Sequence, residues 1–162
     1  MSDYSQLLQR VSELFRYEAG TLVRIQDHAN THVGDEAGWI TRYGYRALCI
    51  DRKCYLMHKL IYLLHHKTWP KVLDHINGNK LDNRIENLRP ASVAQNCWNQ
   101  KIKQRNTSGC KNVSWNKARH KWAVRIRVHG KVKQWYVADL ELADLLAHEA
   151  RTLYHGAFAN HG

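Results

Sequence analysis

The stretch VLDHINGNKLDNRIENLRPASVAQN, residues 72–96, carries most of the information about the fold. Short apolar runs flank a middle part that is rich in Asn and Asp, which predicts a strand, a long loop, a second strand and a helix over residues 71–101. Within it, the pair Asp74 and His75 is followed by Asn87, twelve positions after His75, and by Asn96, nine positions later. We expect these side chains to form one polar site.

These residue types suit the hydrolysis of a phosphodiester bond, which needs a base to deprotonate water and a cation to stabilise the developing charge. At the end of one strand, Asp74 would bind the metal while the neighbouring imidazole of His75 points to the other side and takes the proton of water. The later helix would supply Asn96 as a second oxygen ligand for the metal. The two-sided amide of Asn87 would tie the loop to the strand and hold His75 in orientation.

Oxygen ligands from a carboxylate and an amide, completed by waters, suit Mg²⁺ or Mn²⁺ better than zinc. Another divalent transition metal remains open. Asn99, one turn after Asn96, competes for the role of second ligand. For Arg84 and Arg89 two interpretations stay open, because each side chain either holds a phosphate near the reacting bond or is a solvated charge.

The segment D-H-I-N-G-N-K-L-D-N-R-I-E-N-L-R, followed by Q-N-x-x-N, resembles the HNH homing endonucleases of phages and mobile introns, in the subgroup where Asn replaces the final His. The H-K-L-I at 58–61 is similar too. The resemblance implies a ββα-metal nuclease core in which His75 is the general base, Asp74 and Asn96 bind metal, and Asn87 braces the loop. It also implies cleavage that leaves a 5′-phosphate and a 3′-hydroxyl. Because Asn96 stands where such families usually have His, tight zinc binding is not expected.

The first part of the chain predicts a helix and then hairpins. Residues 4–18 carry apolar side chains at the spacing of a helix with one apolar face, which Gly20 is expected to end. Short apolar segments separated by glycines over residues 21–55 predict irregular hairpins, with Asp51-Arg52-Lys53 as a turn. A second helix is expected over residues 57–66, where we expect His58 to be packed rather than functional.

The last part of the chain predicts a small sheet with one helix. Alternating apolar and polar residues predict strands at 121–129 and 132–138, joined by a turn at His129-Gly130-Lys131, and residues 112–116 are a candidate third strand. Asp139 would cap a final helix that ends before Gly156. We expect the core of this module to contain the helix stripe Leu142, Leu145, Leu146, Ala150 and Leu153.

This module resembles the AP2-like DNA-binding domains, through K-W-A-V-R-I-R at 121–127, Trp135 in the next strand and H-G-A-F-A-N at 155–160. In that family an antiparallel sheet lies in the major groove. Carried over by position, Arg125, Arg127 and Trp135 would face DNA, with Lys133 beside them by alternation. The alternation of residues agrees for the arginines, because the apolar residues of strand 121–129 are expected to face the helix and leave the arginines on the other side. Whether the arginines read guanine edges or hold phosphates stays open.

Composition favours a nucleic-acid partner. The chain has 25 Lys and Arg against 14 Asp and Glu, a formal net charge of +11, which attracts polyanions. The basic stretch at 101–109, which contains Lys101, Lys103 and Arg105, is expected to be a linker that lies on the ligand. The four cysteines have no metal-site spacing and are expected to be reduced.

No secretory signal and no apolar run of membrane-spanning length is found, which favours the cytoplasm. The resemblance to phage and intron endonucleases implies a bacterial host, with a phage or an intron as the source of the gene. We expect an α+β protein with four parts: an N-terminal helix and hairpins (1–56), the ββα-metal core (57–101), a basic linker (102–110), and a three-stranded antiparallel sheet packed on one helix (111–162).

The expected function is that of a sequence-directed, metal-dependent endonuclease of the homing type, which nicks double-stranded DNA as a monomer. Neither a membrane nor a small organic cofactor is expected to take part. The main alternative is a DNA-binding regulator that uses the HNH-like core only as a platform. A weaker alternative is a protein that binds or cuts RNA.

Overall fold

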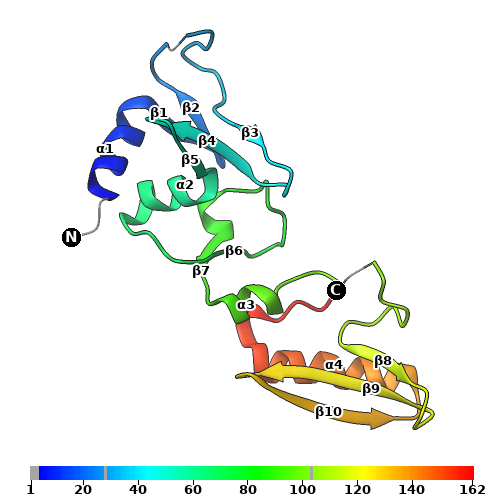
Figure 1. The fold of residues 1–162 in the computed structure, drawn as a ribbon. Helices are drawn as coiled ribbons and strands as arrows, with labels where there is room; N and C mark the ends of the chain where they lie inside the picture. Colours follow the sequence, from blue (N-terminus) through cyan, green and yellow to red (C-terminus); the bar gives the residue numbers. More distant parts are fainter. Residues whose placement is uncertain (1–3, 28, 103) are drawn as a thin grey trace. The chain divides into compact units, whose positions relative to one another are not determined.

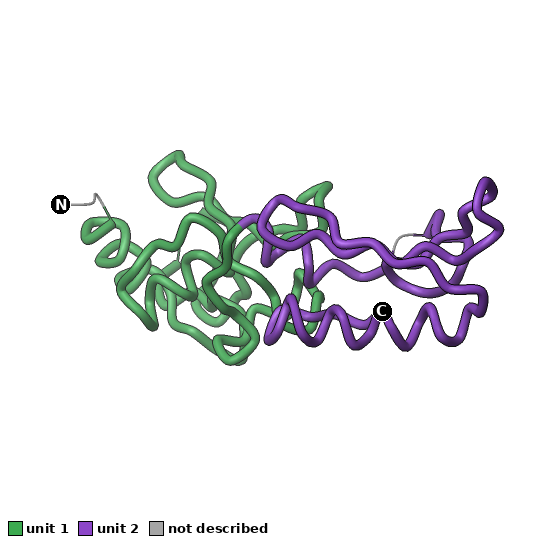
Figure 2. Tube along the Cα trace, turned by 90° about the horizontal axis from the view of Figure 1, so that it is seen from below, with its two compact units in different colours: residues 1–92 green, residues 93–162 purple. Residues whose placement is uncertain are grey.

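The structure is a computed structural model that describes residues 4–27, 29–102 and 104–162. It divides into two compact units, residues 1–92 and 93–162 (Figure 2). Both units combine helices with small antiparallel sheets, so the α+β class is confirmed (Figure 1). No helix in the described part of the chain is long and apolar enough to cross a membrane.

The described residues of the first unit form two helices, seven short strands and one 3₁₀ turn. In chain order these are α1 (Tyr4–Leu14), β1 (Phe15–Glu18), β2 (Thr21–Arg24), β3 (Trp39–Ile40), β4 (Arg46–Ile50), β5 (Lys53–Leu56), α2 (Met57–His66), β6 (Leu73–His75), η1 (Ile85–Asn87) and β7 (Leu88–Pro90). The strands form a β1–β2 hairpin, a β3-β4-β5 sheet and a β6–β7 pair. Helix α2 lies within the core, where Met57, Leu60 and Ile61 have no exposed surface.

Most of the elements expected in this unit are confirmed. Helix α2 spans the residues predicted for it, and residues 71–101 form a strand, a loop, a strand and a helix in the predicted order. The turn between β4 and β5 consists of Asp51 and Arg52, which have φ values of 47° and 64°. Two such residues with positive φ are typical of the tight turns that join antiparallel strands.

The prediction that one helix covers residues 4–18 is wrong, because α1 ends at Leu14 and the next four residues form β1. Ala19 and Gly20 have φ values of 44° and 94°, which suits a two-residue hairpin turn. The turn pairs β1 with β2 and leaves Phe15 only 4% exposed. Hairpin pairing therefore outweighs the helical spacing of apolar residues at this point.

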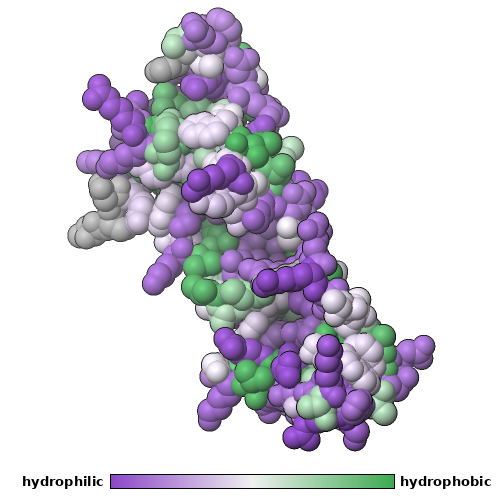
Figure 3. All heavy atoms as spheres, turned by 45° about the vertical axis from the view of Figure 1, so that its right-hand side comes forward, coloured by the Kyte–Doolittle hydropathy of each residue, from purple (hydrophilic) through white to green (hydrophobic). Residues whose placement is uncertain are grey.

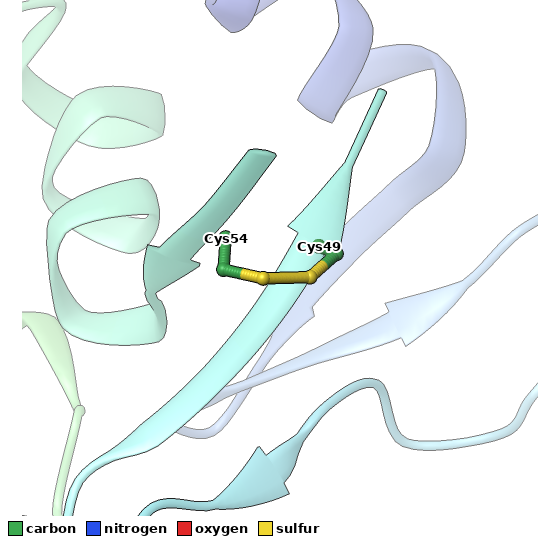
Figure 4. Close-up of a disulfide and its surroundings, with 2 residues drawn as sticks. All are labelled: Cys49 and Cys54. Carbon is green, nitrogen blue, oxygen red and sulfur yellow. A yellow bond between two sulfur atoms is a disulfide. The ribbon is translucent and has the colours of Figure 1, made fainter. Parts of the chain in front are cut away.

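The expectation of four reduced cysteines is wrong for one pair. Cys49 on β4 lies directly opposite Cys54 on β5, and the two sulfurs are bonded (Figure 4). The hairpin register places these residues together, whereas their spacing in the sequence shows no metal-site or redox motif. Cys97 and Cys110 are free thiols.

The second unit contains the predicted sheet and helix. Its elements are α3 (Val93–Trp98), β8 (Val113–Asn116), β9 (Lys121–Val128), β10 (Lys131–Val137), α4 (Leu140–His155) and η2 (Gly156–Phe158). The antiparallel sheet has the order β10-β9-β8, and α4 packs on it through Ala143 and Ala147. The backbone NH of Leu142 donates to Asp139 Oδ1 at 2.8 Å, which confirms Asp139 as the cap of the helix.

The prediction that the leucines of this helix form the core is wrong for three of them. Leu142, Leu145 and Leu153 are 51%, 59% and 73% exposed, and only Leu146 packs partly against the core. Trp122 and Trp135 fill the space between sheet and helix, so small alanine side chains suit the helix face that meets them. On the face that Figure 3 shows, hydrophilic side chains predominate and apolar residues gather only in small groups.

This packing predicts opposite costs for two substitutions on α4. Leu145→Ala removes an exposed side chain and should change the free energy of unfolding by less than about 0.5 kcal/mol. Ala147→Leu overfills a buried site and should cost about 1–3 kcal/mol. Urea denaturation followed by tryptophan fluorescence measures both. A loss of about 2–5 kcal/mol for Leu145→Ala would instead mean that this leucine is a core residue.

Candidate active site

Asp74 and His75 lie at the end of β6, which pairs with β7. The register sets Asp74 opposite Arg89 and His75 opposite Leu88. Both side chains are buried, with 3% of Asp74 and 5% of His75 exposed. The backbone NH of Ile76 donates to the carbonyl of Asn87 at 2.9 Å, which closes the base of the loop between the strands.

The imidazole of His75 is held by a residue of that loop. Its Nε2 lies 3.0 Å from Asn83 Oδ1, and Asn83 is itself 2% exposed. Because an amide oxygen only accepts hydrogen bonds, Nε2 carries the proton and Nδ1 carries the lone pair of the neutral ring. Burial lowers the pKa of His75 from its ordinary value of 6.5, against the opposing effects of the Asn83 hydrogen bond and the Asp74 charge. The structure therefore favours a neutral imidazole.

Asn87 ties together two points of the Asn-rich loop. Its Oδ1 accepts from the backbone NH of Asn77 at 3.0 Å. Its Nδ2 donates to Asn77 Oδ1 at 3.0 Å and to the carbonyl of Asp82 at 2.7 Å. The part that Asn87 is expected to play in orienting the base stays a prediction. The direct support of His75 comes from Asn83.

The loop ends in an ion pair between neighbouring side chains. Arg84 donates from Nε to Asp82 Oδ1 and from the terminal nitrogen to Oδ2, both at 2.8 Å. Asn77 Nδ2 also donates to Asp82 Oδ2 at 2.7 Å. The Arg84 guanidinium, followed by the Asn77 amide, holds the pKa of Asp82 well below its usual range. The contact of Arg84 with phosphate stays a prediction.

Asp74 has an arginine partner across the strand pair. Arg89 contacts Asp74 Oδ2 through Nε at 2.9 Å and through the terminal nitrogen at 2.8 Å. The side chain of Arg89 is 18% exposed, so the interpretation of Arg89 as a solvated charge is wrong. The ion pair fixes the orientation of the carboxylate.

The first hairpin supports the loop from outside the core motif. The backbone NH of Ile85 donates to the Tyr17 hydroxyl at 3.2 Å. A Cβ atom on Gly20 would lie 2.8 Å from the backbone nitrogen of Arg84, so the hairpin turn approaches the loop as closely as only glycine permits. The end of the loop is therefore positioned by residues far away in the sequence.

Sequence reasoning missed two rings beside His75. The ring of His58, on α2, lies 5.0 Å from that of His75 at an angle of 74°. Burial, followed by the neighbouring His75, lowers the pKa of His58 to about 3, and its Nδ1 has no hydrogen-bond partner among the described residues. The Tyr45 ring lies 5.4 Å from His58 and 6.1 Å from His75. The H-K-L-I segment was a signal for His58, but nothing in the sequence marked Tyr45.

The expected second ligand lies in the other unit. Asn96 is half-buried on α3, and its role stays a prediction. Asn99 is 5% exposed, and Asn160 Nδ2 donates to its carbonyl at 2.9 Å. No group of three or more His, Cys, Asp and Glu side chains that could hold a metal occurs among the residues that the structure describes. A donor set of one carboxylate and an amide suits Mg²⁺, which keeps several waters, better than zinc.

The outer face of the β8–β10 sheet carries the predicted arginines. Arg125 and Arg127 are exposed, and Arg125 donates to Ser114 Oγ at 3.3 Å. The cross-strand partner of Arg125 is Gln134. The guanidinium of Arg119 lies 4.6 Å from the centre of the Tyr136 ring. Polar and aromatic side chains that the sequence did not single out thus share this unit with the arginines.

The prediction that Trp135 and Lys133 share the outward face is wrong. Trp135 pairs with Val124, and Lys133 pairs with Ile126, so both point to the helix side. Trp135 packs on the core, and Lys133 Nζ lies 3.2 Å from the hydroxyl of Tyr154 on α4. The strand register, which the sequence does not specify, decides this placement.

The basic linker is partly described. Lys101 and Arg105 are exposed and, together with Lys111, line a cavity of about 330 Å³, whereas Lys103 lies outside the described residues. Lys111 Nζ donates to the carbonyls of Trp98 at 3.0 Å and Asn160 at 2.8 Å. The contact of the linker with DNA stays a prediction.

Comparison with known proteins finds a family match over the segment that carries Asp74, His75 and Asn87. The HNH endonuclease family matches residues 55–97, which include β6, the Asn-rich loop and β7. Protein 3.8 of Escherichia phage T7 is 38% identical over 87 residues, which cover 54% of this chain and 72% of that protein. No solved structure matches the chain. The chain belongs to the HNH endonuclease family and is a relative of the phage Protein 3.8.

Proposed function

We propose that this protein is a sequence-directed, divalent-metal-dependent DNA endonuclease of the homing type. The observation that carries the proposal is the buried imidazole of His75, whose Nε2 is fixed by Asn83 and which lies next to the buried carboxylate of Asp74. A base and an anionic ligand side by side on one strand suit the hydrolysis of a phosphodiester bond. Membership of the HNH endonuclease family supports DNA as the substrate.

His75 would take the proton of the attacking water on Nδ1. A base must be neutral to accept a proton, and burial favours the neutral ring. Because the pKa of His75 is lowered, the neutral form persists to a more acidic pH than for a histidine in water. It is lost only as the pH falls through that lowered value, so cleavage should remain active slightly below neutral pH.

Asp74 and Asn96 are the residues that would hold a divalent ion, with Mg²⁺ or Mn²⁺ as the preferred metal. When bound, such an ion stabilises charge on the phosphoryl group and on the leaving 3′ oxygen. The chain's own contribution is the orientation of the Asp74 carboxylate by Arg89. Asn87 and Asn83 hold the loop, and through it the imidazole, in place.

The second unit would read the DNA. A three-stranded antiparallel sheet backed by one helix, with exposed arginines on the other face, supports an AP2-like mode of binding. Arg125 and Arg127 would contact phosphates or base edges, with Gln134 beside them. One candidate catalytic centre among the described residues supports nicking by a monomer. Cleavage would leave a 5′-phosphate and a 3′-hydroxyl. The phage relative supports action inside a bacterial host.

The central prediction concerns His75→Ala. Incubation of supercoiled plasmid with the parent protein and Mg²⁺ should yield nicked circles, and EDTA should prevent this. The variant should cut at least about 100-fold more slowly, because it lacks the base. It should bind the same DNA with unchanged affinity, as should the surface variant His66→Ala, which should also cut normally. Equal loss of binding and cleavage in His75→Ala would reject the role of base, and a parent protein that binds without cutting would favour the regulator.

A second prediction tests which face of the sheet meets DNA. Arg125→Gln and Arg127→Gln should each weaken binding to a mixed-sequence duplex and, if the arginine holds a phosphate, lower the salt dependence of log Kd by about one counterion. Lys133→Gln removes the same charge from the helix side and should leave both quantities unchanged. Fluorescence anisotropy at several salt concentrations measures them. A loss for Lys133→Gln as large as that for Arg125→Gln would place the DNA elsewhere.

A further inference from the structure

We propose that Arg42, Tyr43 and Lys80 form a second DNA-contacting surface, which we call the β3–β4 patch. This patch binds the sugar–phosphate backbone beside the reacting bond. The inference rests on the proposed nuclease function and adds a substrate contact within the first unit.

The turn that carries Arg42 and Tyr43 is closed by hydrogen bonds. The backbone NH of Thr41 donates to the carbonyl of Tyr45 at 2.8 Å, and that of Gly44 donates to the carbonyl of Thr41 at 2.9 Å. The φ of 76° at Gly44 suits glycine. The closed turn presents Arg42 and Tyr43 to solvent, and Tyr43 is 63% exposed. The guanidinium of Arg42 lies 4.7 Å from the centre of the Tyr43 ring, which partly orders both side chains before any ligand binds.

Lys80 attaches this turn to the Asn-rich loop. Its Nζ donates to the carbonyl of Tyr43 at 3.1 Å and lies 4.7 Å from the centre of the Tyr45 ring. The Tyr45 ring also lies near the rings of His58 and His75. In Figure 1 the turn after β3 lies beside the loop that follows β6. A ligand held by the patch would therefore lie close to the proposed base.

The charges of the patch fit a polyanion. Arg42 and Lys80 are both exposed cations. Acidic side chains on the adjoining segments already have partners, since Glu36 pairs with Arg46 at 2.6 Å and Asp82 pairs with Arg84. Arginine and lysine hold phosphates, and tyrosine offers both a hydroxyl and an apolar ring to the sugar.

The edge strand beside the turn extends the same surface. Trp39 and Ile40 form β3, which lies at the edge of its sheet, and they are 48% and 58% exposed. Exposed aromatic and aliphatic side chains next to cations match the mixed charged and apolar character of a DNA backbone. A protein partner would also accept apolar residues, but the paired cations at the turn favour DNA over an apolar protein surface.

Three variants of the full chain test the patch. Arg42→Gln and Tyr43→Ala should each weaken binding to a fluorescein-labelled mixed-sequence duplex, by about fivefold to tenfold for Arg42→Gln. Only Arg42→Gln should also lower the salt dependence of log Kd by about one counterion. Arg42→Lys should recover most of the lost affinity, because it keeps the charge. The matched control is Arg52→Gln, since Arg52 is an exposed arginine in the turn at the other end of β4.

The controls separate this inference from the proposed function. Circular dichroism and thermal melting should show that all variants are folded, because the altered side chains are exposed. In single-turnover cleavage, Arg42→Gln should raise the protein concentration needed for half the maximal rate without changing that rate. Unchanged affinity in Arg42→Gln, or an equal loss in Arg52→Gln, would overturn the patch even if the parent cuts DNA. If the parent does not cut, the binding comparison still decides whether the patch contacts DNA.

Discussion

The hydrogen bond between His75 Nε2 and Asn83 Oδ1 is the interaction on which the site depends. It fixes which nitrogen of the ring carries the proton, and burial keeps the ring neutral. Asn87 holds the loop that carries Asn83, and the Tyr17 hydroxyl accepts a hydrogen bond at the end of that loop. The short strands and turns of the first unit thus converge on the position of one imidazole.

The place of Asp74 and His75 at the end of one strand, and of Asn87 at the end of the loop that follows, could be predicted from residues 72–96, because their spacing is local to one strand and one loop. Asn83 was not singled out, since it looks equivalent to its neighbours Asn77 and Asn79 until the loop is folded. Tyr45 was missed for a different reason. It directly precedes β4 of the β3-β4-β5 sheet, and its long-range contact with His75 leaves no periodic signal in the sequence.

In the second unit, alternation predicted the strands and the outward arginines, but it did not predict which residues of β10 share a face of the sheet with them. The register of β9 and β10 sets Trp135 opposite Val124, which turns the ring toward the helix. Two tryptophans then occupy the space that the leucines of α4 were expected to fill, so Ala143 and Ala147 meet the sheet. A sequence pattern shows which residues share a face, whereas side-chain volume decides which face packs.

The tautomer of His75 tests the central claim most directly. Long-range ¹H–¹⁵N correlation spectra of the ¹⁵N-labelled protein, assigned by comparison with His75→Ala, report the protonation of both ring nitrogens. The account predicts a neutral ring at neutral pH with the proton on Nε2 and the lone pair on Nδ1, and a loss of this preference in Asn83→Leu. A ring protonated on Nδ1, or a doubly protonated ring at neutral pH, would contradict it.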